Sequence, residues 1–332
     1  MRVDGGPMKT ISTGLKTFIQ SNESVLRVEL LTITLQQGAG VLRYTSLDQD
    51  VVYNGYSWLS GDGQANPGWK RGSISCGIGT DTKTMDLTLF CGPSTLINGV
   101  LVPTFADYGG LDNAIIEVDS LPVAYPAAGQ SINTANGTVN LWTGIAGEIT
   151  ADRTEVRIEV SSLLRILQGA YPRNYTLPTC NNTLYDSACT LIQASYAVTG
   201  SVVTGSWTTN SFDTNLTQIN DYFDQGWIVW TSGANHGLVR TVKLYQNSGG
   251  NLLITYPLPY VPQSGDTFTA YPGCDKTQAT CTNKFNNLIH YRGFPYMPNP
   301  MTLFAGSQPT PGAGGGSANS GPGGTGGNFR QF

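Results

Sequence analysis

Four of the six cysteines fall into two local pairs, and thiols spaced in this way can bind one soft metal centre. Eight residues separate Cys180 from Cys189, and six separate Cys274 from Cys281. Four thiolates that converge from irregular loops saturate either a zinc ion or the irons of a cluster. Neither pair has the two-residue spacing typical of zinc knuckles, which weakens the case for zinc. Disulfides and unpaired structural thiols are the alternatives, and disulfides are disfavoured in a reducing compartment.

Two further cysteines and two histidines are the other candidates for chemistry. Cys76 and Cys91 flank an expected strand and match no ligand spacing, so we expect buried structural thiols. His236 and His290 are the only histidines, and no nucleophile motif accompanies either, so we expect them to form structural hydrogen bonds. The sequence contains no motif of a nucleotide-binding loop, a serine hydrolase or a zinc protease. It therefore favours a protein that is not an enzyme.

The elements that must position these residues are mostly strands. Only 12% of the 332 residues are charged, while glycine numbers 41 and tyrosine 16. The sequence therefore has too few charged residues for long amphipathic helices. Helical spacing occurs at residues 9–20 and 161–167. Short strands are clearest at residues 25–35, 51–58, 85–89, 114–118, 156–160, 227–230, 239–244 and 252–256. This pattern predicts a mainly β chain with few short helices, built as an antiparallel barrel or sandwich.

The composition of the sequence changes twice along the chain, and each change marks an expected domain boundary. Residues 1–168 form a first strand-rich domain. Residues 169–306 begin with a loop rich in tyrosine and proline, and they hold both cysteine pairs with a strand-rich insertion between them. Residues 307–332 form a Gly-rich tail that cannot bury enough apolar surface to fold alone, so we expect it to be flexible.

The distribution of charge argues against two classes of function. The formal net charge is −4, and the 18 basic residues form no cluster, so we expect no sequence-specific binding of nucleic acid. Charged residues, glycine or proline interrupt each apolar stretch before it could cross a bilayer, so we expect no transmembrane helix. The first residues lack the apolar core of a secretory signal, which predicts folding in a reducing cytoplasm.

Residues around the second cysteine pair resemble the C-terminal signature of a family of phage and gene-transfer-agent proteins. The resemblance is carried by residues 271–287 (YPGCDKTQATCTNKFNN) and 290–298 (HYRGFPYMP). It extends to residues 44–50, 142–149, 231–237 and 265–268, so it covers nearly the whole chain except its ends. The tail-tip protein of phage lambda has the same pair spacings. The resemblance implies that Cys180, Cys189, Cys274 and Cys281 ligate a [4Fe–4S] cluster.

The same resemblance implies a place in a virion. Members are subunits of a tail-tip or baseplate hub, with an N-terminal β-barrel hub domain and a C-terminal iron–sulfur module. We expect a homo-oligomeric ring, a trimer, between the distal tail protein and the central fibre or spike protein. Its lumen would pass the tape-measure protein, and the subunit would fold in the cytoplasm of the bacterial host. The alternatives are an iron–sulfur redox protein or electron carrier, and a zinc- or disulfide-stabilised adhesin.

Two features depart from the family pattern, and one motif has two interpretations. His290 stands where the family often has asparagine, and the segment between the cysteine pairs is much longer than in the lambda protein. The motif at residues 292–295 (RGFP) predicts a turn set by Gly293 and Pro295. We expect Phe294 and Tyr296 to cover the cluster from water, in preference to a contact with a partner protein.

Overall fold

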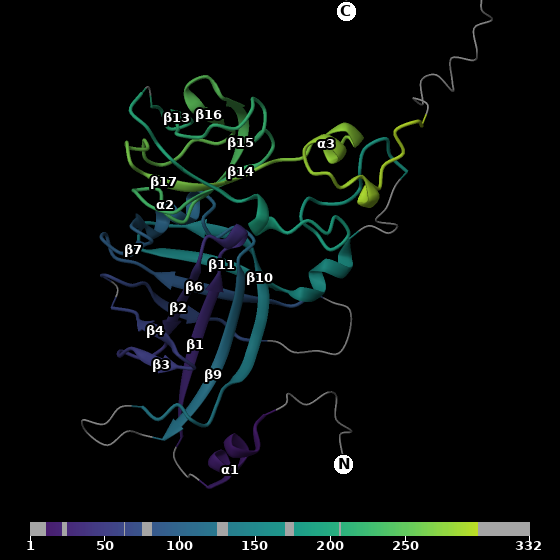
Figure 1. Ribbon diagram of the computed structural model, residues 1–332. Coiled ribbons are helices and arrows are strands. Elements are labelled where there is room, and N and C mark those ends of the chain that lie inside the picture. The colour runs from purple at the N-terminus through teal and green to yellow at the C-terminus, as the bar shows by residue number, and fades with distance from the viewer. Residues whose placement is uncertain are drawn as a thin grey trace, which may run out of the picture.

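The computed structural model describes residues 11–21, 25–62, 64–74, 82–124, 132–169, 176–205 and 207–297. Figure 1 shows two β-rich units, one above the other, with a group of loops and helix α3 (Gln278–Asn283) to one side. The expected mainly β architecture with few short helices is confirmed. Cys76 and the Gly-rich tail predicted at residues 307–332 lie outside the described residues.

The first unit is a single nine-stranded sheet. Its strand order is β3-β4-β2-β1-β9-β10-β11-β6-β5. β1 and β9 form a long antiparallel pair, whereas β2 and β4 are parallel. The bounds are β1 Val25–Thr34, β2 Val41–Thr45, β3 Val51–Tyr53, β4 Tyr56–Ser60, β5 Gly68–Arg71, β6 Thr84–Phe90, β9 Ile115–Ala124, β10 Val139–Ala151 and β11 Glu155–Ser162.

The central strands run between two hydrophobic cores, because successive side chains of a strand point to opposite faces. On β1, Leu31 and Ile33 belong to the main core, whereas Val28 and Leu30 belong to a second, smaller core with Trp58 of β4. β9 is divided between the two cores in the same way. A shift of one residue would exchange the faces, so this double burial fixes the register of β1 against β9.

The sheet curls until its edge strand β5 meets β1, and side chains close the resulting barrel. Arg71 of β5 lies opposite Leu87 of β6, so its side chain is on the same face as this buried leucine. There its Nε donates a 2.9 Å hydrogen bond to Oε2 of Glu29 on β1, and its Nη2 donates to Oε1 of the same carboxylate. A bidentate ion pair thus joins the first and last strands of the wall β1-β9-β10-β11-β6-β5.

Short helices and one small hairpin complete the first unit. α1 (Thr13–Ser21) buries Leu15 and confirms the helical spacing expected near the N-terminus. α2 (Val102–Asp107) follows the β-hairpin of β7 (Leu96–Ile97) and β8 (Val100–Leu101) and packs against β10. Across all the described ranges, in both units and the cysteine loops, the 3-10 helices are η1 Gln36–Gly38, η2 Leu163–Gln168, η3 Gln193–Tyr196, η4 Ser248–Gly250 and η5 Leu288–His290.

The second unit is a six-stranded antiparallel sheet whose two edges meet. Its order is β12-β17-β14-β15-β16-β13. Val202, directly after β12, forms a bridge with Thr214, directly after β13, and the Val203 amide donates to the Asp213 carbonyl over 3.0 Å. The sheet is therefore a closed barrel. The bounds are β12 Val198–Ser201, β13 Ser211–Asp213, β14 Trp227–Trp230, β15 Val239–Gln246, β16 Asn251–Ile254 and β17 Thr267–Tyr271.

Aromatic side chains fill this second barrel. The rings of Phe212, Trp230 and Phe268 pack with centroid separations of 5.3 to 6.2 Å, and all three are buried. They belong to the same contiguous core as the first sheet, so apolar contacts join the two units. The domain boundaries expected from the sequence stay a prediction. Among the described residues, no helix is long and apolar enough to span a membrane.

Candidate metal centre

The second barrel brings the two cysteine pairs to one place. β12 and β17 are antiparallel neighbours, and Val198 at the start of β12 lies opposite Ala270 near the end of β17. The chain therefore enters and leaves this barrel side by side. As a result, the loop that carries Cys180 and Cys189 lies next to the loop that carries Cys274, although the whole barrel separates them in sequence.

All four predicted ligands line one small cavity. Cys180, Cys189, Cys274 and Cys281 contribute to its wall, and none of them forms a disulfide. This is the convergence that the two local pairs predict, while the role of these thiols as ligands stays a prediction. The other lining residues are Asn182, Leu184, Leu191, Lys276, Thr277, Phe285, Asn287 and His290.

The four sulfur atoms share a cavity without forming the tight group that a single ion requires. Zn–S bonds of about 2.3 Å would bring four sulfurs within roughly 4 Å of one another. Within the described part of the chain, no three Cys, His, Asp or Glu side chains are grouped closely enough to hold one metal ion. A shared cavity without a close group of ligands is compatible with a cluster in which each thiol binds a different iron. A cluster holds its ligands farther apart than one ion does.

Backbone amides point at two of the sulfur atoms. The Lys276 amide lies 3.4 Å from Cys274 Sγ, and the Arg292 amide lies 3.3 Å from Cys180 Sγ. The Cys180 amide in turn donates to the Lys276 carbonyl over 2.9 Å, which ties the two cysteine loops together. Such N–H donors stabilise thiolates and tune a bound cluster. The loops are therefore arranged to support negatively charged sulfur.

Burial raises the pKa of the Cys274 and Cys281 thiols above the usual range. The neighbouring Cys180 and Cys189 raise the pKa of both further, since one thiolate repels another. A cationic centre offsets both effects, because its positive charge holds several thiolates together. The electrostatics of the cavity thus suit a metal centre better than four isolated thiolates.

Two glycines fix Cys274 against the barrel. A Cβ atom on Gly273 would lie 2.1 Å from the Asp224 carbonyl oxygen and 2.2 Å from the Gly226 nitrogen. A Cβ atom on Gly226 would lie 2.0 Å from the carbonyl oxygen of Tyr271. Only glycine permits two backbones to approach this closely. The residue before Cys274 is therefore held directly against the turn that precedes β14.

Asn287 connects the cysteine loops, and our reading of the sequence did not single it out. Its side chain is buried, and its Nδ2 donates to the Cys189 carbonyl over 2.6 Å. Its backbone amide donates to the Cys281 carbonyl over 2.9 Å, and its own carbonyl accepts from Cys281 Sγ over 3.2 Å. Asn287 thus contacts one cysteine of each pair. The sequence signal that could have identified Asn287 is its position inside the signature at residues 271–287.

His290 forms the structural hydrogen bonds that we expected, whereas the role of the His236 side chain stays a prediction. His290 Nδ1 lies 2.7 Å from Asn287 Oδ1 and 3.1 Å from the Thr190 hydroxyl. The His290 carbonyl accepts from the Asn182 side chain over 2.9 Å, so this residue also joins the two loops. The backbone amide of His236 donates to the Gly233 carbonyl in a turn before β15, away from the cysteine cavity.

The expectation that Phe294 and Tyr296 cover the cysteine cavity is wrong. Both side chains are exposed, Phe294 to 55% and Tyr296 to 91%, and they line a different hollow. The path of the backbone differs from the expectation: the Phe294 amide donates to the Leu177 carbonyl over 2.8 Å, and the Met297 amide donates to the Phe294 carbonyl over 3.0 Å, so residues 294–297 form a turn at the surface. Phe285 and the two leucines of the cavity wall provide the apolar cover instead.

Cys91 is the buried structural thiol that we expected. It is 5% exposed and belongs to the main core, where burial raises the pKa of its thiol. Its backbone amide donates to the Thr154 carbonyl over 2.9 Å. Cys91 is not among the residues that line the cysteine cavity.

Comparisons with known proteins first define the class of this fold. A chain of the "Virion of native gene transfer agent (GTA) particle" aligns with a TM-score of 0.60 and 22% identity, covering 93% of this chain and 99% of that chain. The two-unit β architecture is therefore shared with a virion component. A search of curated protein sequences found no match.

Family models then identify the chain more closely. Residues 12–192 match the family described as "Baseplate hub protein, N-terminal attachment domain". Residues 221–300 match "Phage conserved hypothetical protein BR0599" and include Cys274 and Cys281. Because the first match covers more than half of the sequence, this chain belongs to the baseplate hub family. It is a structural subunit of a phage-like tail, and the resemblance seen in the sequence is confirmed.

Proposed function

We propose that this protein is a subunit of the tail tip, where copies of it form a ring around the tail lumen. The ring, a trimer, joins the distal tail protein to the central fibre or spike protein and lets the tape-measure protein and DNA pass. A closed ring requires two different contact faces on each subunit, and two joined barrels can supply them. The match of residues 12–192 to a hub attachment domain is the observation that carries this proposal.

The proposal includes a [4Fe–4S] cluster held by Cys180, Cys189, Cys274 and Cys281. Four free thiols in one cavity, amide donors directed at sulfur, and pair spacings unlike those of zinc knuckles support this choice over zinc. When bound, the cluster would cross-link the two cysteine loops through four bonds to sulfur. Its role is therefore structural, and the protein carries out no turnover.

Metal analysis of protein purified without oxygen tests the cluster. We expect equal amounts of iron and acid-labile sulfide, and a brown protein whose visible absorption bleaches with dithionite. Zinc in place of iron would contradict the cluster, and so would a metal-free protein whose thiols are paired as disulfides. A second experiment tests whether the protein is present in purified tails. Co-purification with finished tails supports the hub assignment, whereas absence from them would contradict that assignment.

A further inference from the structure

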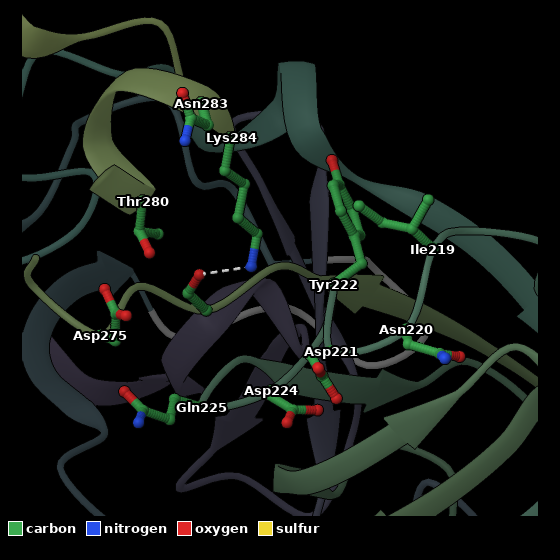
Figure 2. Close-up of a pocket in the computed structure, with 11 residues that line it drawn as sticks. Ile219, Asn220, Asp221, Tyr222, Asp224, Gln225, Asp275, Thr280, Asn283 and Lys284 are labelled. Carbon is green, nitrogen blue, oxygen red and sulfur yellow. Dashed lines mark hydrogen bonds between the residues drawn. The ribbon is translucent and has the colours of Figure 1, made fainter. Parts of the chain in front are cut away.

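Lys284, directly after helix α3, lines a cavity between that helix and the loop at residues 219–225. Figure 2 shows its side chain extending from the end of α3 toward this loop, beside Tyr222, with Asp221 and Asp224 beyond its tip. Its Nζ donates a 2.8 Å hydrogen bond to the Gly273 carbonyl, immediately before Cys274. The ammonium group is therefore fixed beside the backbone of a predicted ligand.

The surroundings of Lys284 hold a positive charge in a half-buried position. Its Nζ lies 5.0 Å from the Tyr222 ring centroid and 5.5 Å from that of Phe285, whose ring also lines the cysteine cavity. Burial lowers the pKa of Lys284, and the negative charges of Cys274, Asp224, Asp275 and Asp221 oppose this shift.

Two other cations near the cavity are in a different environment. Lys276 and Arg292 are exposed, and both contribute backbone amides to the sulfur atoms. Water and salt screen charges on exposed side chains, whereas a half-buried charge acts through a lower dielectric. Lys284 is thus the cation of this region whose charge is held against the cysteine loops with the least screening.

We propose that Lys284 is a positioning residue that offsets the negative charge of the thiolate-bound centre. This inference rests on the proposed cluster. Four thiolates outweigh the positive charge of a cubane core, so the site is net negative when oxidised and more so when reduced. A fixed cation beside Cys274 stabilises both states, and the reduced state more. The hydrogen bond to Gly273 also ties α3 to the barrel through the same side chain.

The reduction potential of the cluster separates the electrostatic role from a merely structural one. Protein purified without oxygen is titrated with dithionite, which supplies one electron to each cluster, and the reduced form is followed by electron paramagnetic resonance. For Lys284→Met we expect a roughly tenfold smaller reduction equilibrium constant, a shift of about 59 mV to more negative potential. Lys284→Arg keeps the charge and should keep the potential close to that of the wild type.

Three control variants complete this experiment. Lys284→Gln keeps a donor for Gly273 without the charge, so it should also shift the potential, and it serves if Lys284→Met does not fold. Lys276→Met removes an exposed charge and should give a smaller shift. Lys243→Met, on the exposed side of β15, should give none. Unchanged potentials in iron-loaded Lys284→Met and Lys284→Gln would overturn this inference alone, whereas an iron-free wild type would overturn the cluster as well.

Discussion

At the scale of single residues, the cysteines divide into two groups with different surroundings. Cys274 and Cys281 line the shared cavity, whereas Cys91 is packed in the apolar core. Replacing Cys274 or Cys281 with Ser should remove iron and visible colour, and it should make the cysteine loops at residues 176–197 and 272–297 sensitive to protease, because these loops lose their common centre. Replacing Cys76 and Cys91 together should leave the iron content unchanged. Brown, protease-resistant Ser variants would contradict the ligand assignment.

A second prediction at this scale concerns the side chain of Asn287. In Asn287→Ala the Cys189 carbonyl loses its donor and His290 loses a side-chain partner. A buried acceptor without a partner costs about 1–3 kcal/mol, so we expect a lower unfolding free energy and faster release of iron to a chelator. Asn283→Ala on exposed helix α3 is the matched control and should change neither quantity. Equal iron release from both variants would show that Asn287 does not hold the loops together.

At the scale of secondary-structure elements, the first barrel depends on a contact between strands far apart in the sheet. Arg71→Met should lower the unfolding free energy by about 1–2 kcal/mol, because it leaves the partly buried Glu29 without its bidentate partner. The pair of Arg157 and Glu155 provides the control, because the Arg157 side chain is 66% exposed whereas that of Arg71 is 26% exposed. Arg157→Met should change stability by less than about 0.5 kcal/mol. Chemical denaturation of both variants measures the difference, and equal effects would argue against closure by this ion pair.

A further prediction concerns the contact between Gly273 and the turn before β14. Gly273→Ala introduces a methyl group where the backbones of Asp224 and Gly226 leave no room, so the Cys274 loop must move away from the barrel. We expect a protein that keeps its barrel but binds less iron. Gly14→Ala in α1 is the control, since nothing lies near its Cβ position and alanine favours the helix. Normal iron binding by Gly273→Ala would show that this close approach does not position Cys274.

At the scale of the whole molecule, apolar contacts join two barrels that the chain visits in succession. The chain belongs to the baseplate hub family, and the proposed ring at the tail tip depends on it. We therefore expect particles made without this protein to lack a completed tail tip and to fail in DNA delivery. Electron microscopy and a DNA-transfer assay measure the two outcomes, and complementation with the intact gene is the control. Normal tails in the deletion strain would overturn the hub assignment.

Much of the local structure could be predicted from the sequence, because the signals were local. Alternation of apolar and polar residues marked β1, β6 and β11, and helical spacing marked α1. The two cysteine pairs and the signature around Cys274 identified the candidate centre and the family. Each of these patterns depends on residues within about ten positions of one another, which is the range in which side-chain period reports backbone conformation.

Only the tertiary structure decided which distant residues meet. The closure of one barrel by Arg71 and Glu29, and of the other between Val202 and Thr214, depends on how far each sheet curls. No local pattern specifies that curvature. For the same reason Asn287 and Lys284 could not be distinguished from other polar residues of the signature, and Phe294 was placed on the wrong surface. The sequence by itself indicated strands with clear alternation, such as β1, β6 and β11, and the cysteine pairs, whereas the long-range pairing of β12 with β17 determined that the thiols share one cavity.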